Sequence, residues 1–119
     1  MPRMALVVDD SMLIRHTICR FLEERGFQVE SATNGREALD VVKRSCPTII
    51  ITDLQMPLMT GNELIAELKT STDTAAIPIV ILAARRSTRD QQTETHAQFV
   101  IYKDIDIEQQ LDRAISSLN

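Results

Sequence analysis

Short apolar runs alternate with amphipathic stretches along the chain, and this alternation restricts the fold more than any other feature. Compact apolar runs rich in β-branched residues occupy residues 5–8, 49–51, 77–84 and 99–102, and a weaker run occupies 27–32. Between the runs, apolar residues recur every three or four positions, as they do on one face of a helix. Strands that alternate with helices predict a parallel sheet with helices on both faces. Unbroken apolar runs are typical of strands that are buried on both sides.

The amphipathic stretches begin and end at residues that favour helix termini. Ser11 offers an N-cap to the first stretch, and Gly26 follows that stretch as a C′ residue does. Pro47 closes the second stretch, and Asp106 can cap the last one. The segment at residues 85–98 differs, because alanine is the only apolar residue type in it. A helix there would have almost no face to bury, so we expect this segment to be short, irregular or mobile.

Length and charge exclude several classes of protein. A chain of 119 residues has the usual size of one domain, and we expect a single domain over residues 1–119. Thirteen basic and 17 acidic residues give a net charge of −4, which argues against direct nucleic-acid binding. No apolar run approaches the roughly 18 residues that span a membrane, and the N-terminus lacks a signal-peptide core. We therefore expect a cytoplasmic protein that does not bind membranes.

The two cysteines give no sign of a disulfide framework or of a zinc site. Cys19 and Cys46 lie far apart in the sequence and lack the spacing of paired zinc ligands. Both stand beside apolar residues, so we expect two buried core thiols.

Charged residues follow three of the apolar runs at the point where each run ends. Asp9 and Asp10 follow the first run, Asp53 follows the run at 49–51, and Lys103 follows the last one. Ligands of an open parallel sheet bind outside the carboxyl ends of its strands. We therefore expect three carboxylates and one ammonium group to converge on one edge of the sheet.

Such a cluster suits phosphoryl transfer. Three close carboxylates repel one another, and a divalent cation relieves this repulsion; hard oxygen ligands suit Mg²⁺. Lys103 can neutralise an incoming anion, and one aspartate can act as the nucleophile and form an acyl phosphate. The alternative is purely structural. An Asp-Asp pair is often a turn or an N-cap, Asp53 can merely end a strand, and Lys103 can be solvated.

In their combination and order, these motifs resemble the receiver domain of two-component response regulators over nearly the whole chain. The resemblance is carried by residues 6–11, 49–57 and 77–84, together with Gly61 and Lys103. It implies one receiver domain with an α/β fold of the flavodoxin-like (βα)5 type, a doubly wound parallel sheet with strand order 2-1-3-4-5. It also implies a phosphoacceptor switch and not an enzyme, because only its own phosphorylation and dephosphorylation are catalysed.

The resemblance assigns roles to individual residues. Asp53 is the implied phosphoacceptor, which receives a phosphoryl group from the phosphohistidine of a sensor histidine kinase or a phosphotransfer protein. Asp10, Asp53 and the backbone carbonyl of Gln55 are the implied direct ligands of Mg²⁺, and Asp9 acts through water. The side chain of Gln55 stands where family members influence the rate at which the acyl phosphate hydrolyses.

Other family positions are partly kept and partly changed. The resemblance implies that Lys103 and the backbone amide of Ala84 contact the phosphoryl group. Ala83 replaces the usual Thr or Ser, Val100 replaces the usual aromatic switch residue, and Asp104 replaces the usual proline. Without that proline, the usual reason for a cis peptide bond is gone. We expect the phosphoryl chemistry to be kept and the output relay to be atypical.

Two functions from different classes compete for this chain. The first is a phosphorylation-dependent receiver, either stand-alone or part of a longer regulator, that switches its binding to a downstream protein or a fused output domain. The alternative is an atypical receiver that acts as a phosphorylation-independent protein-interaction domain. A small Mg²⁺-dependent phosphatase is more distant, because 119 residues leave little room for a substrate cap. Receivers often pair through a face formed by their last two helices and the strand between them, so a homodimer is a possible assembly.

Overall fold

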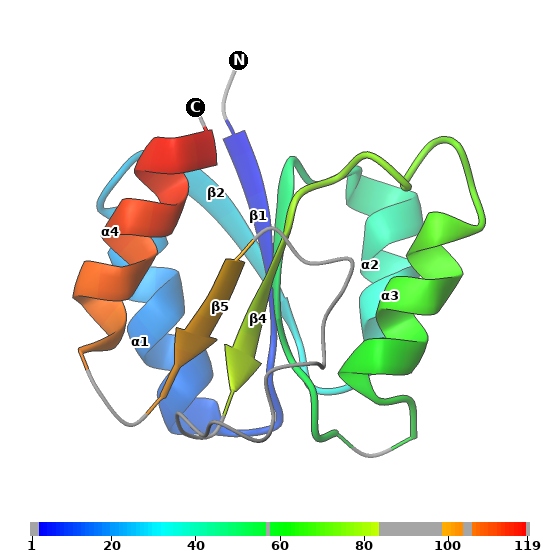
Figure 1. The fold of residues 1–119 in the computed structure, drawn as a ribbon, viewed down its shortest axis with the longest axis horizontal. Helices are drawn as coiled ribbons and strands as arrows, with labels where there is room; N and C mark the ends of the chain where they lie inside the picture. The colour runs from blue at the N-terminus through cyan, green and yellow to red at the C-terminus, as the bar shows by residue number, and fades with distance from the viewer. Residues whose placement is uncertain (1–2, 57, 84–98, 104–105, 119) are drawn as a thin grey trace.

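Five parallel strands form one sheet in the computed structural model, which describes residues 3–56, 58–83, 99–103 and 106–118 (Figure 1). The strands are β1 (Arg3–Val8), β2 (Phe27–Ala32), β3 (Ile49–Asp53), β4 (Ile79–Ala83) and β5 (Phe99–Tyr102). The helices of the described part are α1 (Met12–Glu23), α2 (Gly35–Ser45), α3 (Gly61–Lys69) and α4 (Ile107–Leu118). The strand order is β2-β1-β3-β4-β5, which confirms the predicted doubly wound fold. The segment at residues 85–98 and Asp104 lie outside the described residues.

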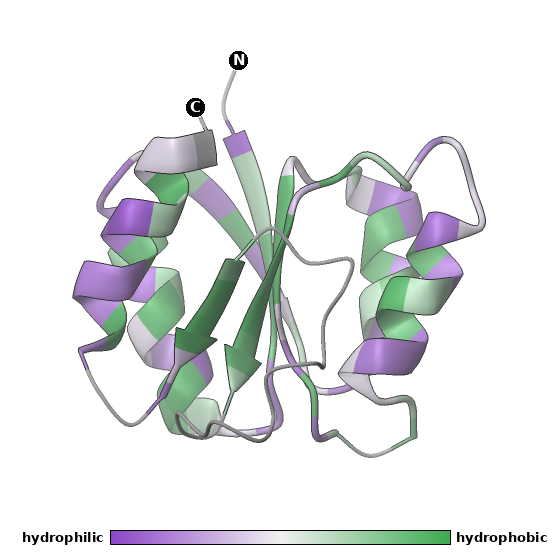
Figure 2. Cartoon of the chain, viewed as in Figure 1, coloured by the Kyte–Doolittle hydropathy of each residue, from purple (hydrophilic) through white to green (hydrophobic). Residues whose placement is uncertain are grey.

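Each face of the sheet carries a separate hydrophobic core. Side chains alternate between the two faces along a strand, so Val7 and Ile51 pack with Ile18 of α1 and Leu111 of α4. The neighbouring strand residues face the other way and pack against α2 and α3, in a core that includes Leu6, Ile50, Ala38 and Leu64. Figure 2 shows β4 and β5 as hydrophobic strands between these helix layers. Burial on both faces explains why the strands read as apolar runs.

The N-termini of α1 and α4 begin at the predicted capping residues. The side chain of Ser11 accepts a hydrogen bond from the backbone N–H of Ile14 at the start of α1. Asp106 accepts one from the N–H of Gln109 at 3.1 Å, at the start of α4. Gly26 was predicted directly after the C-cap of α1, but the C-cap is Glu24, so Gly26 lies one residue further on. Its φ of 90° is a backbone conformation that glycine adopts without steric cost. Within the described part of the chain, no helix has the length and hydrophobicity needed to cross a bilayer.

Two further expectations from the sequence were wrong in detail. β4 begins at Ile79 rather than at residue 77, because Pro78 has no N–H to donate to the sheet. The Pro78 carbonyl still accepts a hydrogen bond from Ile50 at 3.0 Å. Cys46 was expected to be buried but is exposed, and Cys19 is only half-buried. Cys46 is the left-handed C-cap of α2, with a φ of 49°, so it lies beyond the regular turns whose apolar face packs on the sheet.

Candidate functional site

The ends of β1 and β3 place three acidic side chains together. These two strands are neighbours, with Val8 opposite Thr52, so Asp9 and Asp53 follow side by side. Asp9, Asp10 and Asp53 each offer one carboxylate oxygen, and these oxygens all lie within 4.8 Å of one another. Asp9 is 0% exposed and Asp53 is 6% exposed, whereas Asp10 is exposed to solvent. The structure therefore brings together the three carboxylates that the sequence placed at strand ends.

Lys103 carries the counter-charge for the two buried carboxylates. Its backbone N–H donates to the carbonyl of Ala83 at 2.8 Å, which extends the pairing of β5 with β4 by one residue. Its Nζ lies 2.7 Å from Asp9 Oδ2 and 3.1 Å from Asp53 Oδ2. Removing carboxylates from water is costly unless an opposite charge is close, and this ammonium group supplies it for both.

Burial and mutual repulsion shift the ionisation of this cluster. Burial, together with the negative charge of Asp9, raises the pKa of Asp53, although Lys103 and the N–H of Gln55 act in the opposite direction. Burial alone would lower the pKa of Lys103, but its contacts with Asp9 and Asp53 outweigh this and raise it. The ammonium group thus stays charged at neutral pH, while the ionised form of Asp53 is less favourable than that of an aspartate in water.

We expect Asp53→Asn to raise the thermal stability of the metal-free chain at neutral pH. The pKa of Asp53 is higher in the folded than in the unfolded state, so wild type loses stability as the pH rises through the folded pKa. We expect a Tm about 3–5 °C higher for the variant at pH 7. The difference should vanish near the unfolded pKa of about 4. Thermal unfolding of both chains in EDTA across this pH range measures it, and a less stable variant at pH 7 would contradict the shift.

Three hydrogen bonds hold Asp9 in the turn between β1 and α1. Its N–H donates to Ala32 O at 3.1 Å, its Oδ1 accepts from Ser11 N at 2.8 Å, and its carbonyl accepts from Arg15 Nη1 at 2.9 Å. The remaining atom, Oδ2, is buried without a hydrogen-bond partner among the described residues. It forms the short ion pair with Lys103 Nζ, at 2.7 Å. Oδ2 thus keeps a lone pair available to a cation or to an ordered water.

The turn after β3 holds Asp53 in a similar way. Asp53 Oδ1 accepts a hydrogen bond from Gln55 N at 3.3 Å, and its carbonyl accepts one from the Thr52 hydroxyl at 2.9 Å. Gly61 N donates to Leu54 O at 3.0 Å. A Cβ on Gly61 would collide with the carbonyl oxygen of Asp53 and the Cα of Leu54. Glycine is needed here because two backbone segments touch beside Asp53, and not because its own φ is positive.

The donor set fits a hard divalent cation. Carboxylate oxygens are the ligands that Mg²⁺ prefers. Three carboxylates meet here, and Oδ2 of one of them, Asp9, is buried without a hydrogen-bond partner among the described residues. The cluster has three carboxylates and the ammonium group of Lys103, which contacts two of them, so negative charge is in excess. The direct role of Asp10 and of the Gln55 carbonyl in metal binding stays a prediction, as does the water-mediated role of Asp9. Ala84, whose amide was predicted to contact the phosphoryl group, lies outside the described residues.

The two atypical switch positions lie on β4 and β5. Ala83 is half-buried at the end of β4 and presents a methyl group where a hydroxyl was usual. Val100 pairs with Ile81 and packs against the core under α2 and α3. By the alternation of a strand, Tyr102 follows Val100 on the same face of β5. Ala83 thus lacks the hydroxyl, and Val100 the aromatic ring, that the resemblance to receiver domains leads us to expect at these positions.

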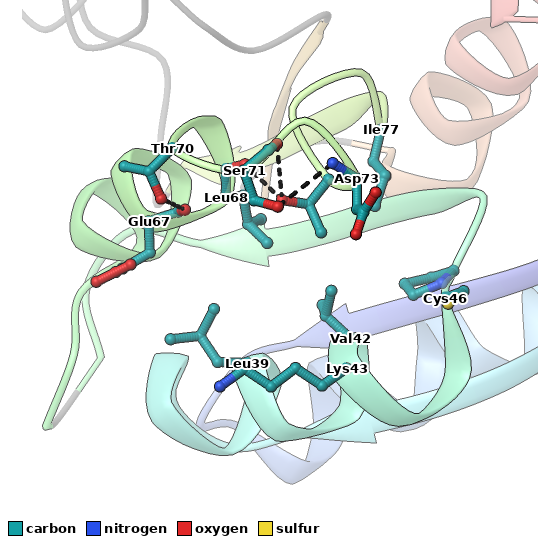
Figure 3. Close-up of a pocket in the computed structure, with 12 residues that line it drawn as sticks. Leu39, Val42, Lys43, Cys46, Glu67, Leu68, Thr70, Ser71, Asp73 and Ile77 are labelled. Atoms are coloured by element: carbon teal, nitrogen blue, oxygen red, sulfur yellow. Dashed lines mark hydrogen bonds between the residues drawn. The ribbon is translucent and has the colours of Figure 1, made fainter.

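A groove of about 600 Å³ lies elsewhere, between the C-terminal ends of α2 and α3 (Figure 3). Leu39 and Val42 line it from α2, with Cys46 beyond them, and the charged Lys43 and Glu67 also border it. The helices run back from the carboxyl edge of the sheet, so this groove lies toward the opposite edge. None of the predicted site residues lines it. The acid cluster, rather than this groove, therefore holds the groups that can carry phosphoryl chemistry.

A sheet of order 2-1-3-4-5 with three carboxylates and a lysine at its carboxyl edge defines the receiver class of signalling domains. The response regulator receiver domain family matches residues 5–115. The chain therefore belongs to this family, whose members interact with histidine kinases or phosphotransfer proteins.

Two similar proteins are response regulators that are longer than this chain. The response regulator MprA of Mycolicibacterium vanbaalenii is 37% identical over 91 residues, which cover 76% of this chain and 38% of that protein. The response regulator Rre1 of Synechocystis is 34% identical over 91 residues, which cover 76% of this chain and 39% of that protein. The chain thus spans about two fifths of the length of these two relatives.

Solved structures match the fold along the full chain. The chemotaxis response regulator CheY4 of Vibrio cholerae superposes with a TM-score of 0.90 and 28% identity, and the match covers 100% of both chains. The receiver domain of a signal transduction histidine kinase from Syntrophus aciditrophicus gives a TM-score of 0.82 and 31% identity, covering 98% of this chain and 92% of that one.

Proposed function

We propose that this chain is a phosphoacceptor switch in which Asp53 takes a phosphoryl group from a phosphohistidine. The donor is a sensor histidine kinase or a phosphotransfer protein, and phosphorylation changes how the domain binds a downstream protein or a fused output domain. The observation that carries this proposal is the contact of Lys103 with both Asp9 and Asp53, at 2.7 and 3.1 Å. Three different strands deliver these side chains, so their meeting is a property of the whole sheet.

The transfer forms one bond and breaks one. A carboxylate oxygen of Asp53 attacks the phosphorus atom, the new P–O bond forms, and the P–N bond of the phosphohistidine breaks with its electron pair moving to the imidazole. Lys103 is charged at neutral pH and compensates the negative charge of the phosphoryl oxygens. Asp10, Asp53 and the Gln55 carbonyl would hold Mg²⁺, with Asp9 acting through water; the bound ion neutralises phosphoryl charge as a Lewis acid.

The surroundings of Asp53 fit a nucleophile. The group is only 6% exposed, and burial raises its pKa, which makes the carboxylate more basic than one in water. Gln55 N–H binds Oδ1 and Lys103 contacts Oδ2, so both carboxylate oxygens have a partner that orients them. The exposed side chain of Gln55 stands two residues after the acceptor, where it can affect the approach of hydrolytic water.

The output step is where a second candidate function arises. Ala83 has no hydroxyl to bind a phosphoryl oxygen, and Val100 has no ring that can change its position. These two residues favour a domain that binds its partner in the same way with or without phosphorylation. The acid cluster with its lysine favours the phosphorylated switch, and we adopt that function.

Thermal unfolding with Mg²⁺ and with the phosphoryl mimic beryllofluoride tests the proposal. Mg²⁺ at about 100 times its Kd should stabilise the wild type by about 2.7 kcal/mol. Asp10→Asn should remove this response without unfolding the chain, because Asp10 is exposed. The exposed Asp73→Asn serves as a matched control and should respond as wild type does.

Beryllofluoride should stabilise the wild type further, only when Mg²⁺ is present, and should have no effect on Asp53→Asn. A wild type that responds to Mg²⁺ and not to beryllofluoride would instead support the phosphorylation-independent interaction domain.

A further inference from the structure

The free edge of β5 lies next to the lysine of the site. β5 is the last strand of the sheet, so no strand pairs with its outer side among the described residues. The N–H of Lys103 points inward to Ala83 O of β4, at 2.8 Å. Backbone groups of successive residues alternate between the two sides of a strand, so the N–H and C=O of Tyr102 point outward, where a sixth strand would lie. Unpaired groups at this place would leave the end of β5 free to move.

The side chain of Gln110 fills the place of that missing strand. The N–H of Tyr102 donates to Gln110 Oε1 at 2.9 Å, and Gln110 Nε2 donates to the carbonyl of Tyr102 at 2.8 Å. A carboxamide has one acceptor and one donor group side by side, as a peptide group does, so it satisfies both backbone groups of one residue. Gln110 thus pairs with the residue directly before Lys103.

Gln110 itself is held firmly by α4. Its Nε2 also donates to Asp106 O at 3.2 Å, and its own N–H donates to the same carbonyl at 3.3 Å. Asp106 in turn caps the helix through Gln109 N. The next residue, Leu111, is 0% exposed in the core between α1, α4 and the sheet. The carboxamide therefore joins the end of β5 to a helix that cannot shift without disturbing that core.

We propose that Gln110 is a positioning residue for Lys103. By binding both backbone groups of Tyr102, it fixes the end of β5, so the Lys103 ammonium group stays within reach of Asp9 and Asp53. The ammonium group lies 2.7 Å from Asp9 Oδ2 and 3.1 Å from Asp53 Oδ2, and a shift of the Lys103 backbone would carry it away from both. The effect on phosphoryl transfer rests on the proposed function, whereas the effect on the backbone does not.

Amide hydrogen exchange of the metal-free chain tests the backbone part. We expect the N–H groups of Tyr102 and Lys103 to exchange about tenfold faster in Gln110→Ala than in wild type. Gln110→Glu should protect Tyr102 N–H partly, because its carboxylate still accepts but no longer donates. Gln109→Ala removes the same side chain from the neighbouring exposed position and should exchange as wild type does. Unchanged exchange at Lys103 in Gln110→Ala would overturn the proposal.

The rate of phosphoryl uptake from a small phosphodonor tests the chemical part. At saturating Mg²⁺ we expect the rate per folded molecule to fall about tenfold in Gln110→Ala, and less in Gln110→Glu. The Mg²⁺ concentration at half-maximal rate should stay unchanged, because the carboxylates are not moved. Uptake by Gln110→Ala at the wild-type rate would overturn the positioning role. If wild type itself takes up no phosphoryl group, the proposed function fails, and exchange at Lys103 N–H alone decides whether Gln110 positions that residue.

Discussion

Lys103→Met is expected to lower the free energy of unfolding by about 3–5 kcal/mol in the absence of Mg²⁺. Methionine keeps the apolar stem of the side chain and removes only the ammonium group. Asp9, 0% exposed, and Asp53, 6% exposed, would then be two buried carboxylates without a counter-charge. Urea denaturation in EDTA near pH 7 measures the loss.

Two further variants separate this mechanism from a general effect of losing a lysine. Lys43→Met removes a charge from an exposed position on α2 and should cost less than about 0.5 kcal/mol. Adding Asp53→Asn to Lys103→Met should restore part of the lost stability, because it removes one of the two carboxylates left without a counter-charge. The stability effects of substitutions at residues in contact are not additive. If Lys103→Met is as stable as Lys43→Met, the two carboxylates do not depend on this cation, and the account of the site is wrong.

Gly61→Ala is expected to cost about 3 kcal/mol or more, although alanine is the better helix former. The added Cβ would meet the carbonyl oxygen of Asp53 and the Cα of Leu54. Both obstacles are backbone atoms, which cannot move aside as the end of a side chain can. The start of α3 must therefore shift away from Asp53, and we also expect weaker Mg²⁺ binding.

A neighbouring substitution controls for helix propensity. Asn62→Ala lies at the next, exposed position of α3 and should leave the Tm unchanged or slightly raised. Thermal unfolding of the two variants side by side gives the comparison. A Gly61→Ala chain with the Tm of wild type would show that the backbones after β3 and before α3 do not need this close approach.

The fold could be predicted from the sequence because its strands are buried on both faces. A short run of β-branched residues such as 49–51 indicates a buried strand, and the helices between the runs carry clear apolar faces. The order of the strands is not encoded in that periodicity, and it came only from the resemblance to receiver domains. The burial of Cys46 was predicted wrongly because this residue is the left-handed C-cap of α2. A residue in that conformation no longer follows the helical repeat of the residues before it.

The charged groups of the site could also be predicted, because strand ends identify them. Asp9, Asp53 and Lys103 end or follow three strands that the sheet brings to one edge. The residues that hold this cluster in place could not be found in the same way. Arg15 binds a backbone carbonyl six residues away and Gln110 binds backbone groups eight residues away, and neither contact follows a helix or strand period.

Intact mass after incubation with Mg²⁺ and a small phosphodonor is the most direct test of the central claim, that Asp53 accepts a phosphoryl group. The wild type should gain the mass of one phosphoryl group, the gain should require Mg²⁺, and Asp53→Asn should gain nothing. A gain by wild type would also show that Ala83 does not abolish the chemistry. If wild type gains no mass with either a small phosphodonor or a cognate kinase, and beryllofluoride also fails to bind, Asp53 is not a phosphoacceptor and the account is contradicted.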